Sequence, residues 1–171
     1  GAVTSQRISF FMRHFILLLS IGLLCQCAQL PHKVGMTRDD FGLNFVSVRV
    51  NGHPGVFLVD SGASHTVLDQ RFAERCMENL EASNLRLAWL GSRNATTKKG
   101  IVHEMQVGNY RQLGPYRANV LNLDAINNAP ARNQTIRMDG ILGADFLILH
   151  GALIDYSNSS LRFRNGPPRR G

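Results

Sequence analysis

A single carboxylate stands where an apolar run ends: Phe57-Leu58-Val59 is followed directly by Asp60-Ser61-Gly62-Ala63-Ser64. One interpretation is a strand that ends in an Asx turn, where Asp60 accepts a hydrogen bond from nearby backbone. The other is a catalytic carboxylate at the bottom of a cleft, held by backbone N–H groups and able to take a proton from water. In that case Gly62 lets another backbone approach closely, and Ser61 bonds across to a symmetry-related copy.

A second apolar segment, Gly140-Ile141-Leu142-Gly143, follows about eighty residues later and is expected to be a strand. Asp139 and Asp145 flank it, and Asp155 ends a further short strand. Asp145 stands where a helix N-terminus favours negative charge. We therefore expect these three residues to start a helix or to cap turns, which leaves Asp60 as the carboxylate available for chemistry.

Together the two segments resemble the retropepsin-like aspartic proteases, a family that includes the retroviral enzymes and their cellular and bacterial single-domain relatives. In this family a hydrophobic-hydrophobic-Asp-Ser/Thr-Gly-Ala motif carries the catalytic aspartate, and a later hydrophobic-hydrophobic-Gly strand threads beside it. The resemblance covers residues 42–164. It implies an all-β, single-domain acid protease fold with one or two short helices. It also makes Asp60 the catalytic residue, supported by Ser61, Gly62 and Ala63 of the motif.

The resemblance further implies hydrolysis of protein or peptide substrates, with no metal and no cofactor. Two neighbouring carboxylates share one proton, so that one activates water while the other donates to the substrate carbonyl. The chain has one Asp-Ser-Gly and no second Asp-Thr/Ser-Gly, so both aspartates cannot come from one copy. A homodimer with a twofold axis beside Asp60 would supply the second.

By position, residues 85–107 match the hairpin that forms the family's flap. Alternating runs at 85–90 and 101–107 surround a polar tip that begins at Ser92, and Gly91 and Gly100 are the expected hinges of a lid over bound peptide. An ordinary exposed hairpin is the alternative.

The remaining elements are predicted from local signals. Asn51-Gly52 is a strong signal for a hairpin turn between two strands. Residues 69–80 place apolar side chains four apart and predict a helix. Further strands are expected at 42–50, 55–59, 116–123, 152–156 and 161–164, a helical turn or two at 144–150, and a loop at 127–138.

Composition and the chain ends limit the possible classes of protein. With 44% hydrophobic residues, the 171-residue chain can bury a core. Residues 1–28 resemble a leader, with Arg13 and His14 before the apolar run 15–24, which predicts export to the periplasm, to the outside or to a membrane anchor. Residues 29–41 are expected to be a linker and 165–171 a disordered tail. Lipidation of Cys25 or Cys27 is a minor alternative, and without the leader Cys76 alone remains, so no internal disulfide can form.

Three other functions compete with peptide hydrolysis. His65 invites a Ser-His pair with Ser61 or Ser64, but no G-x-S-x-G elbow is present. The net charge of +7 would suit nucleic acid, but the basic residues are scattered, so no nucleic-acid partner is expected. The third is an inactive peptide-binding module of the same fold that stays monomeric.

Overall fold

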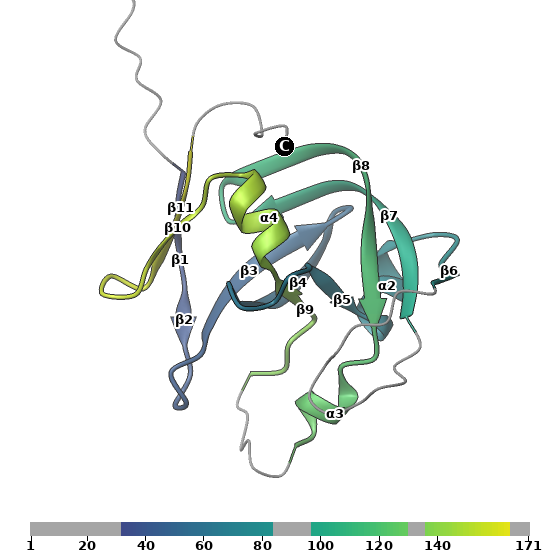
Figure 1. Ribbon diagram of the computed structural model, residues 1–171, viewed down its shortest axis with the longest axis horizontal. Helices are drawn as coiled ribbons and strands as arrows, with labels where there is room; N and C mark the ends of the chain where they lie inside the picture. The colour runs from purple at the N-terminus through teal and green to yellow at the C-terminus, as the bar shows by residue number, and fades with distance from the viewer. Residues whose placement is uncertain (1–31, 84–96, 130–135, 165–171) are drawn as a thin grey trace, which may run out of the picture. The chain divides into compact units, whose positions relative to one another are not determined.

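The computed structural model of the protein describes residues 32–83, 97–129 and 136–164 (Figure 1). Within these ranges the chain forms eleven strands, β1–β11, and three short helices, α2, α3 and α4. The predicted all-β class with one or two short helices is confirmed in a mostly-β fold, in which α3 (Asp124–Asn127) is a third short helix. None of the helices in these ranges is long and apolar enough to cross a membrane.

Eight strands form the main sheet in the order β2-β3-β4-β9-β5-β8-β7-β6, and an additional pairing of β3 with β7 curls it back on itself. Strands β3 (Asn44–Val50) and β4 (His53–Val59) are antiparallel. They are joined by Asn51 and Gly52, whose φ angles are 47° and 84°. Positive φ at both central residues is what a tight hairpin turn needs, so the predicted hairpin is confirmed.

The centre of this sheet explains why Phe57, Leu58 and Val59 at the end of β4 are apolar and buried. Strand β9 (Gly140–Leu142) pairs parallel with β4 on one side and antiparallel with β5 (Val67–Asp69) on the other. Successive side chains of a strand point to opposite faces. Phe57 and Val59 pack into one hydrophobic cluster and Leu58 into a second. Because both faces of β4 are covered, the chain reaches Asp60 from a rigid, buried strand.

The long strands β7 (Thr97–Val107) and β8 (Tyr110–Leu121) pair with each other and curve around the sheet (Figure 1). Strand β6 (Glu81–Ser83) pairs with the start of β7. Gly100 therefore lies within β7, opposite Ala118, and a Cβ added to it would be 2.4 Å from the sulfur of Met77. The prediction that Gly100 is a hinge is wrong, because this glycine is a buried, paired strand residue.

A second sheet joins the two ends of the domain, in the order β1-β11-β10. Its strands are β1 (His32–Gly35), β11 (Ser160–Phe163) and β10 (Leu153–Asp155), while β2 (Thr37–Arg38) pairs with β3. The prediction of a linker at 29–41 is therefore wrong from His32 onward. Val34 and Met36 are buried in the main cluster, an alternation that the neighbouring Pro31 and Gly35 concealed.

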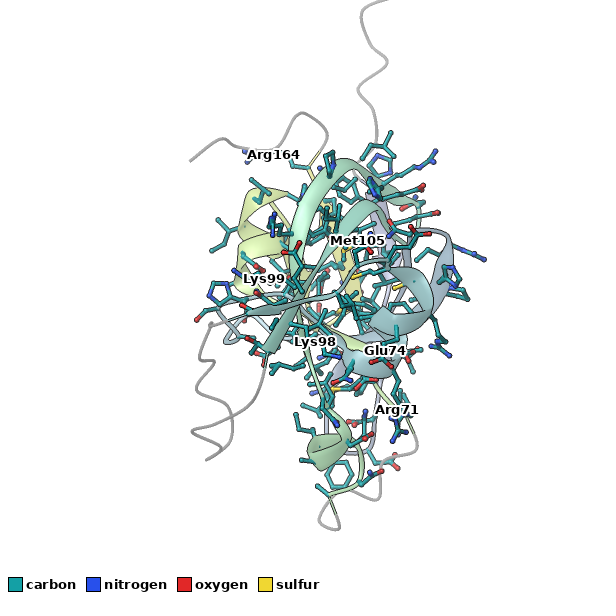
Figure 2. The ribbon with its side chains drawn as sticks, turned by 90° about the vertical axis from the view of Figure 1, so that its right-hand side faces the viewer. Arg71, Glu74, Lys98, Lys99, Met105 and Arg164 are labelled. Atoms are coloured by element: carbon teal, nitrogen blue, oxygen red, sulfur yellow. The ribbon has the colours of Figure 1, made fainter. Side chains whose placement is uncertain are left out.

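Helix α2 (Gln70–Cys76) begins after Asp69, whose carboxylate accepts a hydrogen bond from the backbone N–H of Arg71 at 3.1 Å. It ends four residues before the prediction because Met77 is already extended. Ion pairs lie on its outer side. Lys98 Nζ is 3.6 Å from Glu74 Oε1 (Figure 2), and Arg71 Nη2 is 2.8 Å from Asp124 Oδ2 of α3. Such pairs contribute only ~0–1 kcal/mol each, so the buried face of α2 holds it in place.

Candidate active site

Asp60 follows the last residue of β4, and main-chain contacts fix it on two sides. Its N–H donates to the carbonyl of Leu142 in β9 at 3.1 Å. Its Oδ1 accepts from the N–H of Gly62 at 2.9 Å, and its carbonyl accepts from Ala63 at 3.2 Å. Asp60 is half-buried, while Ser61 and Gly62 are exposed. The carboxylate is thus held in one place and open to solvent, as a group that takes a proton from water must be.

The turn after Asp60 lies directly against the segment that leaves β9. Ala144 donates its N–H to the carbonyl of Ala63 at 2.8 Å, and Ala63 packs on the second hydrophobic cluster. A Cβ on Gly143 would lie 2.4 Å from the carbonyl carbon of His65. Only glycine allows the two backbones to come this close. The predicted neighbourhood of the two segments is therefore confirmed.

Hydrogen bonds between Thr66 and Asp145 hold the turn after Asp60 against the segment that leaves β9. The sequence analysis did not predict this contact. Asp145 Oδ1 accepts from the backbone N–H of Thr66 at 2.8 Å and from its hydroxyl at 2.7 Å. The same hydroxyl accepts from the N–H of Gly143 at 3.0 Å. Asp145 does stand in the first turn of α4 (Ala144–Leu149), as predicted. Its side chain, however, accepts hydrogen bonds from a residue 79 positions away, and no local sequence pattern predicts such a pair.

Helix α4 is anchored in turn by aromatic contacts. The ring of Phe146 packs against that of His150, with the ring centroids 4.2 Å apart and the planes tilted by 47°. The Tyr110 hydroxyl of β8 lies 2.8 Å from His150 Nδ1. Burial lowers the pKa of His150, which keeps the ring neutral in neutral solution. The chain segment that supports Asp60 is therefore itself fixed to the body of the domain.

The other candidate carboxylates are engaged elsewhere. Asp139 accepts from the backbone N–H of Val56 at 3.0 Å. Asp155 caps a turn, and hydrogen bonds from Ser157 and then Asn158 lower its pKa to about 2. Asp155 agrees with the turn role predicted for it, whereas the carboxylate of Asp139 bonds a residue 83 positions away and not its own turn. Among the described residues no hydrogen bond or ion pair brings a second carboxylate to Asp60.

Gly91 and Ser92, the expected flap residues, lie outside the described ranges. Within those ranges, no group of three or more His, Cys, Asp or Glu side chains could hold a metal ion.

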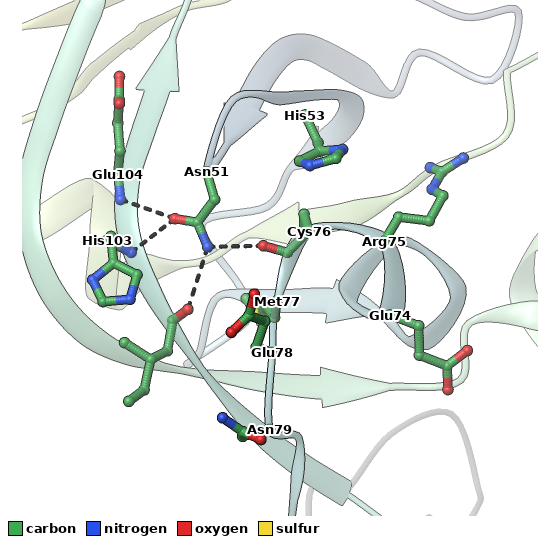
Figure 3. Close-up of a pocket in the computed structure, with 11 residues that line it drawn as sticks. Asn51, His53, Glu74, Arg75, Cys76, Met77, Glu78, Asn79, His103 and Glu104 are labelled. Atoms are coloured by element: carbon green, nitrogen blue, oxygen red, sulfur yellow. Dashed lines mark hydrogen bonds between the residues drawn. The ribbon is translucent and has the colours of Figure 1, made fainter.

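A hollow of about 640 Å³ lies at the opposite end of β4 from Asp60 (Figure 3). Its wall is tied together by Asn51, whose amide nitrogen donates to the carbonyl of Cys76 at 2.9 Å and whose oxygen accepts from the N–H of His103 at 2.8 Å. The hydrogen bonds of Asn51 brace the β3–β4 turn. Three of the charged side chains of the hollow pair with residues outside the lining: Glu74 with Lys98, Arg75 with Asp139, and Glu104 with Arg111.

An Asp-Ser-Gly turn at the end of a doubly covered strand, crossed by a glycine-bounded second strand, defines the retropepsin-like class of aspartic proteases. The sequence model of the family described as aspartyl protease matches residues 46–146. The chain belongs to this family, and the resemblance inferred from the two motifs is confirmed.

Three similar proteins illustrate the relationship. DNA damage-inducible protein 1 of Cryptococcus neoformans is 30% identical over 142 residues, which cover 80% of this chain and 29% of that protein. The human protein DDI1 homolog 2 is 32% identical over 123 residues, 68% of this chain and 26% of that protein. A retropepsin-like aspartic protease from Rickettsia conorii superimposes with a TM-score of 0.51 at 14% identity, covering 78% of this chain and 90% of that one. The chain thus spans less than a third of the curated relatives named here, while the Rickettsia structure supports the fold.

Proposed function

We propose that the protein is an aspartic endopeptidase whose active site forms when two copies each contribute Asp60. The observation that carries this proposal is the carboxylate of Asp60, held by the N–H of Gly62 and half-exposed at the end of a buried strand. Among the described residues no hydrogen bond or ion pair joins a second carboxylate of the same copy to it. A second copy related by a twofold axis is the source that supplies an identical group in equivalent geometry.

The chemistry follows from the pairing. Two carboxylates held close together cannot both stay ionised, so the pair keeps one proton. The ionised aspartate takes a proton from water, whose oxygen attacks the peptide carbonyl carbon, while the protonated aspartate donates to the carbonyl oxygen. The tetrahedral intermediate then returns its hydroxyl proton to one carboxylate, and the C–N bond breaks as the amine takes the other proton. Both aspartates end as they began, with one proton between them.

A surface for the second copy is available on α4 and β10. Four of the seven exposed large hydrophobic side chains of the described residues fall within this short stretch: Ile148, Leu149, Leu153 and Tyr156. Within the described residues β10 is also an edge strand, since it pairs with β11 on one side alone. Exposed apolar side chains beside an unpaired strand edge favour association with another chain.

The test is the rate of cleavage of a denatured protein against pH, at two enzyme concentrations well apart. A shared proton predicts a bell-shaped profile, because activity needs one ionised and one protonated carboxylate. Dilution should lower the specific activity, and Asp60→Asn should abolish it without unfolding the protein. A single rising limb with concentration-independent activity would contradict the shared site. Peptide binding without cleavage at any pH would favour the inactive peptide-binding module instead.

We propose in addition that residues 1–28 direct export, on the basis of the apolar run 15–24 after Arg13 and His14. Cell fractionation tests this. A processed or membrane-bound chain is expected, and full-length chain in the cytoplasmic fraction would contradict export.

A further inference from the structure

The buried histidine at the end of α4 connects four elements, and the proposed chemistry does not use it. His150 is 4% exposed. Its Nδ1 lies 2.8 Å from the Tyr110 hydroxyl at the start of β8, and its ring packs on that of Phe146. The Tyr110 ring in turn stacks on Phe163 of β11, with the centroids 4.2 Å apart, and meets His32 of β1 edge to face at 5.5 Å. The end of α4 is therefore fastened to β8 and, through Tyr110, to the terminal sheet β1-β11-β10.

This contact favours the neutral imidazole. A neutral ring can accept the Tyr110 hydroxyl proton at Nδ1, whereas a protonated ring is a donor at both nitrogens. The phenol oxygen would then have to accept, and its own proton would lose its buried partner. Burial raises the pKa of Tyr110 and lowers that of His150, so the pair contains no phenolate that could neutralise an imidazolium. A proton on His150 is thus a buried charge, which is costly unless it is paired.

The surroundings of His150 supply no paired carboxylate for that charge. Among the described residues no ion pair joins its ring to an acidic side chain. Asp145 lines the same hollow of about 160 Å³ between α4 and β8, but its Oδ1 accepts from Thr66 and its Oδ2 faces His65. Aromatic rings attract a cation by only ~0.5–2 kcal/mol. The other titratable or charged groups near the contact include no carboxylate: His32 of β1, Tyr116 and Arg117 of β8, and Arg164 after β11.

We propose that His150 is an acid-sensitive latch, which as a neutral imidazole holds the end of α4 against β8 and the terminal sheet, and which releases both when it is protonated. In the open form the imidazole has its ordinary pKa near ~6.5, and in the closed form the pKa is lower. The closed form is therefore fully favoured above ~6.5 and loses stability as the pH falls below that value. Release also affects the candidate site, because Asp145 in the first turn of this short helix holds Thr66 beside the turn of Asp60. The latch itself does not depend on the proposed peptidase function.

The test is backbone hydrogen exchange followed by NMR on the full chain, over a pH series from about 7.5 to about 5 that spans the ordinary histidine pKa. Wild type is compared with His150→Gln, which cannot take up this proton but keeps a polar group for the Tyr110 hydroxyl. The matched control is His103→Gln, which changes an exposed histidine of β7. The amides of β11 and α4 report on the latch, and those of residues 57–59 in β4 are the reference. Their ratio of protection factors removes the direct effect of pH on exchange.

We expect this ratio to fall by up to about tenfold for each pH unit below ~6.5 in wild type and in His103→Gln, since opening takes up one proton. The ratio should stay constant in His150→Gln. A constant ratio in wild type, or an equal fall in His150→Gln, would overturn the latch.

The imidazole resonance of His150 in wild type provides a second measurement that needs no folded variant. It should titrate at lower pH than the resonances of exposed histidines, together with the loss of protection in β11. Titration near ~6.5 with unchanged protection of α4 and β11 would contradict the latch. Neither measurement uses a substrate, so a protein without peptidase activity would leave their outcome valid.

Discussion

Replacing Gly143 with alanine should displace the turn that carries Asp60. The added Cβ would lie 2.4 Å from the carbonyl carbon of His65, 2.6 Å from its oxygen and 2.8 Å from the nitrogen of Thr66. All three are main-chain atoms, which cannot swing aside as the tip of a side chain can. Carbon atoms in contact normally lie about 3.5–4.0 Å apart, so the two backbones must separate by roughly 1 Å.

Overpacking of this kind costs ~1–3 kcal/mol. For a domain of this size each kcal/mol lowers the Tm by about 3–4 °C, so Gly143→Ala should lower it by about 3–12 °C. Thermal unfolding followed by circular dichroism measures this without any assumption about activity. Gly35→Ala is the matched control, because a Cβ there meets nothing within 4 Å. Equal Tm values for the two variants would refute the close contact between the Asp60 turn and the β9–α4 segment.

Three further predictions concern Thr66, Cys76 and Asp155. Thr66→Val should lower the free energy of unfolding by ~1–3 kcal/mol, because it leaves the buried N–H of Gly143 without an acceptor, whereas Thr66→Ser should retain most of the stability. Urea unfolding of both variants measures this. Equal losses would contradict the role of the hydroxyl. Burial raises the pKa of Cys76 to about 11, so its thiol should react with a disulfide reagent far more slowly in the native than in the unfolded protein. The measurement uses a Cys25→Ser, Cys27→Ser chain, in which Cys76 is the one thiol. Equal rates would contradict its burial. The pKa of Asp155 is lowered by folding, so this carboxylate stabilises the fold above its unfolded pKa near 3.8, and the contribution is lost as the pH falls towards about 2. The Tm difference between wild type and Asp155→Asn should therefore shrink over that interval. A constant difference would contradict the turn contacts.

The parts of the structure that local sequence signals encode were predicted correctly. Asn51-Gly52 specifies its turn by the conformations its two residues tolerate. The unbroken apolar run before Asp60 reflects a strand that is covered on both faces. Gly143 lies where the backbone after β9 contacts the backbone of His65 and Thr66. The glycine is visible in the sequence, but its contact partners are not.

What the sequence did not predict depends on contacts between distant residues. The hydrogen bonds of Thr66 to Asp145 span 79 positions. Strand β1 is stabilised by β11, with His32 opposite Phe163, so its few residues looked like a linker when taken alone. Gly100 appeared to be a hinge because glycine often marks loops, whereas here it makes room for the side chain of Met77.

The most direct test of the shared active site mixes wild-type protein with the Asp60→Asn variant and allows the subunits to exchange. The wild-type concentration is kept constant and high enough for dimers, and peptidase activity is measured as the variant increases. If each active site needs Asp60 from two copies, random pairing leaves about half of the activity at equal amounts and about a tenth at a ninefold excess. Activity that stays constant across the series would show that one copy acts alone, and would contradict the proposed dimer.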